Sequence, residues 1–295
     1  MRHREYGATI AMKTALENIW FGKTRWQQEL KARWFRMARR GAPPPSQDPV
    51  VVFAIPLVSR RRAPEWDQVC ANLAATLDSF QRQTDPRWQA VICGQDAPAL
   101  PDDPRIRFLK IRLRDTFYDK GHKRRYLIAD VARRLGADGY YMQFDADDIL
   151  HPNVVAHMRT DHNGRGYRIT DGYFVSLSAG IVTKLHPFDS QCGSSTAVYV
   201  DFRTRKTHRI LLNDHRSHMR IAASCEAFGQ PLDPVPFPAA LYMTGHGQNM
   251  IARRGKIEAR TLAQLPHALP PAQARAVCAT FGIEDDWVAD PPPIG

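Results

Sequence analysis

The sequence has no long hydrophobic run and few cysteines. No apolar segment approaches the roughly 20 residues that a membrane-spanning helix needs, so we expect no integral membrane protein. Five cysteines are spread over 295 residues without a C-x-x-C pair, which disfavours a disulfide framework and a thiolate zinc site and favours a reducing compartment. The basic first residues are not followed by an apolar signal-peptide core. We therefore expect a cytoplasmic protein.

The composition is that of a soluble, globular and basic chain. Hydrophobic residues make up 43% of the sequence, charged residues 24%, and the formal net charge is +11. Residues 1–40 hold ten Lys and Arg against three Glu, so +7 of this charge lies in a short N-terminal arm. The remaining chain has a nearly ordinary charge balance.

Apolar residues recur at helical spacing among the basic residues of the arm. They predict a tryptophan-rich amphipathic helix whose apolar residues are Leu16, Trp20, Trp26, Leu30, Trp34 and Met37. Such a helix can lie on an anionic membrane surface, which would make the protein a peripheral membrane protein. It can equally dock its tryptophan face on the body of the protein or on a second subunit. We expect no nucleic-acid partner, because nothing besides the charge resembles a nucleic-acid-binding module.

The order of the remaining segments predicts a fold class. Residues 50–58 (VVVFAIPLV) form an apolar run typical of a parallel strand that is covered on both faces. Strand and helix patterns then alternate, with strands expected at 88–93, 106–111 and 140–144 and helices at 66–80 and 122–135. The order predicts an α/β domain with a doubly wound, mostly parallel sheet, which binds ligands at the carboxyl ends of its strands.

We expect four regions along the chain. The arm (residues 1–40) is followed by a stiff, proline-rich linker (41–49), which separates it from the α/β domain (50–250). A helical or irregular extension (251–295), for which the sequence suggests no function, completes the chain.

The most informative motif is the acidic turn after the strand at 140–144. Asp145 and Asp147 are separated by one small residue and are followed by Asp148. Two carboxylates in this arrangement can converge on Mg²⁺ or Mn²⁺, which would keep positions open for diphosphate oxygens. Acidic turns also cap helices, but the turn follows the strands of a doubly wound sheet, where nucleotides bind.

Four local motifs resemble glycosyltransferases of GT-A fold, close to glycosyltransferase family 2, over residues 50–250. The motifs are Ile55-Pro56, the NLAATLDSFQRQT segment (72–84) before the second strand, the KGHKRR segment (120–125), and the CGSSTAVYV segment (192–200) followed by Asn213-Asp214. The resemblance implies a Rossmann-like fold and transfer of a sugar from a nucleotide-diphosphate sugar, with UDP or dTDP as the first expectation. The acceptor would be a hydroxyl of a glycan or a lipid-linked molecule, and the reaction would be inverting.

The resemblance also implies a role for each matching residue. Asp145 matches the first Asp of the D-x-D motif, associated with ribose and metal, while Asp147 and the late His246 match metal ligands. Asp214 matches the general base, with the neighbouring His215 as the alternative. The remaining matches would contact the nucleotide or its diphosphate: Pro56, Asp96, Lys120, Lys123, Arg124 and Arg125.

Two alternatives remain open at the level of sequence. The domain could be a catalytically inactive fold that serves as a binding or scaffold protein. Alternatively, the closely spaced His208, His215 and His218 could share a metal in a hydrolase, since His215 and His218 are three residues apart and would lie on one face of a helix.

Overall fold

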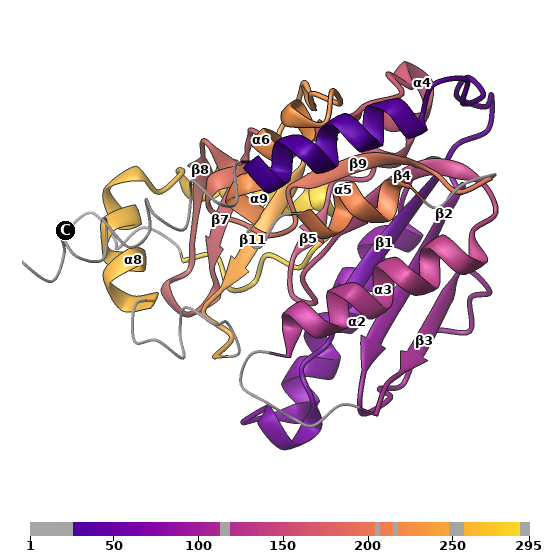
Figure 1. Cartoon of the computed structure of the whole chain (residues 1–295). Helices are drawn as coiled ribbons and strands as arrows, with labels where there is room; N and C mark the ends of the chain where they lie inside the picture. The colour runs from indigo at the N-terminus through magenta and orange to yellow at the C-terminus, as the bar shows by residue number, and fades with distance from the viewer. Residues whose placement is uncertain (1–25, 113–118, 204–206, 215–217, 248–256, 290–295) are drawn as a thin grey trace, which may run out of the picture.

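The computed structural model describes residues 26–112, 119–203, 207–214, 218–247 and 257–289 (Figure 1). A seven-stranded sheet has the order β10-β6-β9-β4-β1-β2-β3. Its central strands β1, β2, β3 and β4 are mutually parallel, whereas β9 runs antiparallel to β4 and to β6. The strand bounds are β1 (Val50–Pro56), β2 (Trp88–Gly94), β3 (Ile106–Lys110), β4 (Asp138–Gln143), β6 (Gly166–Arg168), β9 (Thr196–Asp201) and β10 (Asp233–Pro234).

Both faces of this sheet are covered by helices. Alternate residues of β1 belong to two separate cores, because successive side chains of a strand point to opposite faces. Phe53 packs with α2 (Trp66–Gln81) and α4 (Val154–Asp161). Val52 packs on the other face with α3 (Lys120–Arg134), α5 (His208–Asp214) and α6 (Ile221–Ala227). The predicted doubly wound, mostly parallel α/β sheet is therefore confirmed.

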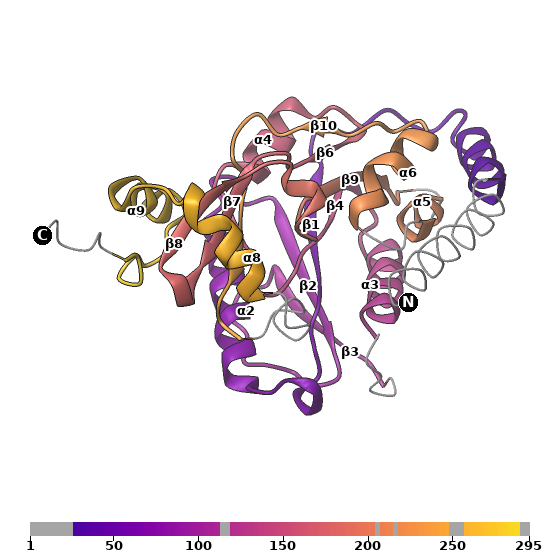
Figure 2. The same cartoon turned by 90° about the vertical axis from the view of Figure 1, so that its left-hand side faces the viewer.

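A second sheet, which the sequence did not predict, lies beside the first. It has the order β5-β11-β7-β8, with bounds β5 (Ile149–Leu150), β7 (Gly172–Ser176), β8 (Ile181–Leu185) and β11 (Ala240–Thr244). The C-terminal helices α8 (Ile257–Gln264) and α9 (Pro271–Phe281) lie next to these strands (Figure 2). Cys278 and Phe281 of α9 are buried in the core of this sheet. The C-terminal extension thus covers a sheet that borders the acidic turn.

The N-terminal arm is not a separate element. The described part of its helix, residues 26–38, lies beside α5 and α6 (Figure 2). Phe35 is buried and its ring contacts the rings of Phe228 and His208 edge-on. The linker also packs on the body, since Ser46 donates hydrogen bonds to the Asp138 carboxylate. The linker therefore contacts the body as well as joining the arm to it.

Within the described residues, none of the helices combines the length and the apolar character that crossing a bilayer requires.

Candidate active site

The acidic turn lies at the carboxyl end of β4, as the fold class predicts. Strand β4 pairs with the parallel strand β1 on one side and the antiparallel strand β9 on the other, so the turn lies between the carboxyl end of β1 and the amino end of β9. Asp145 accepts a 2.7 Å hydrogen bond from the ammonium of Lys120, the first residue of α3. Partial desolvation would lower the pKa of Lys120, whose side chain is 48% exposed, but the carboxylates of Asp145, Asp147 and Asp148 raise it above its ordinary value. Lys120 therefore remains a cation next to the turn.

His246 joins the turn from a distant part of the sequence. Its Nε2 lies 3.3 Å from Oδ2 of Asp147, and its Nδ1 lies 3.0 Å from the side-chain amide nitrogen of Asn72 on α2. The imidazole is almost fully buried, whereas the Asp147 side chain is 22% exposed. Two of the predicted metal ligands are thus adjacent, and Asn72 fixes the orientation of the imidazole.

The buried core of the turn is Asp148, to which the sequence assigned no role. Its Oδ2 accepts hydrogen bonds from Ser194 Oγ at 2.6 Å and Cys192 Sγ at 3.0 Å, and its Oδ1 accepts one from the amide of Met243 at 3.3 Å. Burial and the charges of Asp147 and Asp145 raise the pKa of Asp148 well above its ordinary value, while the bonds from Cys192 and Ser194 act in the opposite direction. Asp148 thereby ties the turn to the segment before β9 and to β11.

Ser194 and Gly193 position Asp145. The hydroxyl of Ser194 accepts a 2.8 Å hydrogen bond from the amide of Asp145. A Cβ on Gly193 would lie 2.8 Å from Oδ2 of Asp145, so this position has no room for a side chain unless the carboxylate moves. The sequence showed the CGSS segment only as a family match. Its contact with the turn could not be inferred, because Ser194 and Asp145 are 49 residues apart.

The predicted cations of α3 occupy three different environments. Lys123 is fully buried and donates to the carbonyl of Leu57 at 2.7 Å and to Asp119 at 2.6 Å, so it holds the loop after β1. Burial lowers the pKa of Arg124, and the nearby charge of Asp145 opposes this shift. Arg125 is exposed. Lys120 therefore contacts the acidic turn, Arg124 lies one helical turn further along α3, and Lys123 is a structural residue.

Pro56 and Asp96 lie at the carboxyl ends of β1 and β2. Pro56 is the last residue of β1. Asp96 follows β2 and accepts a 2.8 Å hydrogen bond from the amide of Arg60, which fixes the loop after β1. Both predicted residues are thus at the edge of the sheet that carries the acidic turn.

An arginine from the C-terminal extension closes the other side. The guanidinium of Arg260 on α8 lies 4.8 Å from the ring centre of Tyr242 and 5.3 Å from that of Phe174, and it donates a 2.7 Å hydrogen bond to Gln191. Tyr242 precedes Met243, whose amide binds Asp148, so Arg260 packs on the strand that also holds the acidic turn. Sequence reasoning missed Arg260, since no motif covers residues 251–295.

The three predicted metal ligands are not assembled as a set. Asp145 is bonded to Lys120, while Asp147 contacts His246. In the part of the chain that the structure describes, no group of three or more His, Cys, Asp or Glu side chains is arranged to hold a metal ion. The adjacent oxygen and nitrogen of Asp147 and His246 are nevertheless suitable donors. Magnesium commonly takes only one or two protein carboxylates and fills its remaining positions with phosphate oxygens and water.

Asp214 does not have the surroundings of a general base. Its carboxylate is 4% exposed and accepts hydrogen bonds from Gln28 at 2.8 Å, Lys31 at 3.1 Å and Ser224 at 3.3 Å. Gln28 and Lys31 belong to the N-terminal helix, which covers the carboxylate. An acceptor hydroxyl could reach Asp214 only if this helix moved. Asp214 is therefore better assigned as an anchor of the N-terminal helix. His215, the alternative base, lies outside the described residues.

Replacing Asp214 by alanine should loosen the N-terminal helix without impairing the acidic turn. The change leaves Gln28 and Ser224 without their shared acceptor, and we expect a loss of about 1–2 kcal/mol in the free energy of unfolding. Hydrogen exchange should become faster for the amides of residues 26–38. Glu226→Ala, an exposed carboxylate on the adjacent α6, is the control. Unchanged protection of the helix together with abolished catalysis would restore the general-base assignment.

The three histidines do not form one cluster. His208 is buried beneath the N-terminal helix, where the amide of Asp201 donates to Nδ1 at 3.1 Å and Nη1 of Arg39 lies 2.7 Å from Nε2. His218, on the 3-10 turn His218–Arg220, instead packs against the 3-10 turn Phe188–Ser190. With His215 outside the described residues, the shared metal of the hydrolase alternative has no support among the residues that are described.

His208 should make the stability of the fold depend on pH. Burial, reinforced by Arg39, lowers its pKa from 6.5 to about 3. As the pH falls below about 6.5, His208 takes up a proton in the unfolded chain but stays neutral in the folded chain. The free energy of unfolding therefore decreases as the pH falls from about 6.5 toward 3. Between pH 7.5 and 5.0 the loss from this residue should be about 2 kcal/mol. Denaturant titrations should show a correspondingly shallower pH dependence in His208→Gln; identical slopes would contradict the assignment.

Comparison with known proteins finds a distant structural likeness. No protein-family model matches the chain, and no curated protein matches it. Among solved structures, the crystal structure of 4-diphosphocytidyl-2C-methyl-D-erythritol synthase is similar at 11% sequence identity over 74% of this chain and 100% of that chain, with a TM-score of 0.39.

Proposed function

We propose that the protein is a metal-dependent glycosyltransferase that moves a sugar from a nucleotide-diphosphate sugar to a hydroxyl of a glycan or lipid-linked acceptor. The observation that carries the proposal is the acidic turn at the carboxyl end of β4, where Asp147 contacts His246 and Asp145 contacts Lys120. This is the edge at which doubly wound sheets bind nucleotides. UDP and dTDP remain the first expectation for the donor.

In this proposal, different residues around the turn bind the metal, the diphosphate and the ribose of the donor. Asp147 and His246 would hold Mn²⁺ or Mg²⁺, and the bound metal would neutralise charge on the departing diphosphate. Lys120 and Arg124 are cations on the α3 side of the turn, where they can attract phosphate oxygens. Asp145 is placed by Ser194 and is available to the ribose or the metal once Lys120 turns to the diphosphate.

Inversion at the sugar requires a base on the acceptor hydroxyl. Because the N-terminal helix covers Asp214, we propose the neighbouring His215 for this role. His215→Ala should then reduce sugar transfer about 10²-fold or more and leave donor affinity unchanged.

Thermal unfolding with nucleotides tests the donor class. We would measure the midpoint with UDP, dTDP, GDP and CMP, each with and without Mn²⁺, because a ligand that binds only the folded state stabilises it. At a hundred times its dissociation constant, such a ligand adds about 2.7 kcal/mol. We expect one nucleoside diphosphate to raise the midpoint by several degrees only when Mn²⁺ is present. No shift in folded protein with any nucleotide would favour the scaffold alternative.

A further inference from the structure

The N-terminal helix docks on the body with the face opposite to its tryptophans. Ala32 and Phe35 are buried, and Gln28 and Lys31 bind Asp214 on the same side. Arg39 adds a 2.8 Å hydrogen bond to Gln230. Because these contacts join the helix to α5, α6 and the loop beyond α6, its orientation on the body is set over its described length.

Docking leaves a row of large apolar side chains on the outside, which we name the tryptophan stripe: Trp26, Leu30, Trp34 and Met37. Their exposed fractions are 64%, 45%, 47% and 59%. With 3.6 residues per turn, these positions fall on one side of the helix, roughly opposite Phe35. Half of the large apolar side chains that are exposed in the described part of the chain belong to this one row. A folded protein rarely exposes such a patch unless it binds something.

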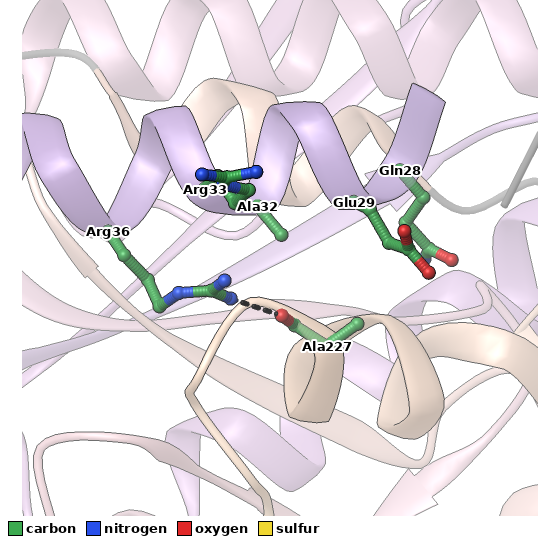
Figure 3. Close-up of a pocket in the computed structure, with 6 residues that line it drawn as sticks. All are labelled: Gln28, Glu29, Ala32, Arg33, Arg36 and Ala227. Atoms are coloured by element: carbon green, nitrogen blue, oxygen red, sulfur yellow. Dashed lines mark hydrogen bonds between the residues drawn. The ribbon is translucent and has the colours of Figure 1, made fainter. Parts of the chain in front are cut away.

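A row of cations, here named the arginine flank, borders the stripe on one side: Arg33, Arg36 and Arg40. All three are exposed. Arg33 and Arg36 also line a shallow groove between the helix and α6, where Arg36 donates a 2.6 Å hydrogen bond to the carbonyl of Ala227 (Figure 3). Over residues 26–40 the sequence has five Lys and Arg and one Glu. The partner of the stripe must therefore accept positive charge beside apolar contact.

We propose that the tryptophan stripe and the arginine flank dock the protein on an anionic lipid membrane. Tryptophan favours the depth of the lipid headgroups, because its ring is apolar and its N–H is polar. Exposed arginines beside it would meet lipid phosphates. A second copy of the chain is a poorer partner, since a symmetric contact between two stripes brings two arginine flanks into one interface. The membrane contact does not depend on which reaction the acidic turn performs.

Vesicle co-sedimentation of the full chain tests this surface. The vesicles are equal parts phosphatidylglycerol and phosphatidylcholine, or phosphatidylcholine alone. We expect the protein to bind the anionic vesicles, and this binding should weaken strongly in high salt. Binding to vesicles of phosphatidylcholine alone should be much weaker. The double variant Trp26→Ser/Trp34→Ser should bind at least about tenfold more weakly. Met219→Ser/Leu262→Ser removes two apolar side chains that are at least as exposed elsewhere, at 65% and 64%, and should bind as wild type does.

A charge-reversal pair tests the arginine flank separately. Arg33→Glu/Arg40→Glu should also weaken binding at least about tenfold at low salt. Lys110→Glu/Lys184→Glu makes the same change in net charge at exposed positions on β3 and β8, and should have a smaller effect. Failure of the wild type to bind anionic vesicles would overturn the proposal, as would equal binding by the stripe variant and its control. A wild-type dimer that the stripe substitutions convert to a monomer, without vesicle binding, would assign the stripe to a second copy.

Discussion

Replacing Asp147 by asparagine should abolish metal-dependent donor binding and reduce sugar transfer at least about 10²-fold. The substitution keeps the size of the side chain and removes its charge, which a hard divalent cation needs. Because the side chain is 22% exposed and the substitution keeps its shape, the melting temperature should change little. The expected result is therefore loss of the Mn²⁺-dependent nucleotide shift in a protein that remains folded.

The control for Asp147→Asn is a carboxylate whose removal should not change donor binding. Asp233 on β10 is 40% exposed and pairs with Arg165, so Asp233→Asn is a matched control. Titration calorimetry with the stabilising nucleotide, with and without Mn²⁺, measures the effect directly. Equal donor affinity in wild type and Asp147→Asn would exclude Asp147 as a metal ligand, and the proposed function would lose its main support. His246→Ala should show the same loss to a smaller degree, because one carboxylate ligand remains.

The second large effect should come from Asp148→Ala, through stability rather than binding chemistry. The substitution leaves three donors without their acceptor: the Ser194 hydroxyl, the Cys192 thiol and the Met243 amide. We expect the free energy of unfolding to fall by about 2–4 kcal/mol, since each buried donor left unpaired costs about 1–3 kcal/mol and the removed charge offsets part of this. Nucleotide affinity should fall as well, because Ser194 also holds the amide of Asp145.

The pH dependence of this effect has a definite sign. The pKa of Asp148 is raised by folding. A carboxyl group of this kind stabilises the fold most below its unfolded pKa near 4, and the contribution falls as the pH rises. The stability difference between wild type and Asp148→Ala should therefore be larger at pH 4.5 than at pH 8 in denaturant titrations. Asp102→Ala, an exposed carboxylate after β2, is the control. A difference that grows with pH would show that Asp148 is ionised in the fold.

Part of this organisation follows from local sequence patterns. The run at 50–58 predicts a buried parallel strand, because a strand that is covered on both faces needs apolar residues at consecutive positions. In the structure, β1 does contribute to a core on each face of the sheet. The acidic turn was identifiable because it directly follows a strand of the predicted sheet. The edge that carries Asp145, Asp147, Pro56 and Asp96 was thus predictable without the structure.

Other assignments depended on contacts between distant segments. Gln28 reaches Asp214 across 186 residues, and Ser194 reaches Asp148 across 46. The residues next to Asp214 and Asp148 in the sequence do not indicate that these hydrogen bonds form. The second sheet was missed for a similar reason: its strands are short, and β11 completes it from more than 60 residues after β7. No local periodicity shows where such strands pair.

The sequence by itself determined the fold class, the position of the acidic turn and the helical nature of the arm, because each depends on the spacing of neighbouring residues. Only the tertiary structure decided which face of the arm is buried. The helix carries apolar residues on two sides, Phe35 on one and the tryptophan stripe on the other. Hydrophobic spacing alone would predict that the side with more apolar residues, the tryptophan stripe, is the buried one. The buried polar partners, Asp214 and His208, select the smaller face, since their hydrogen bonds form only there.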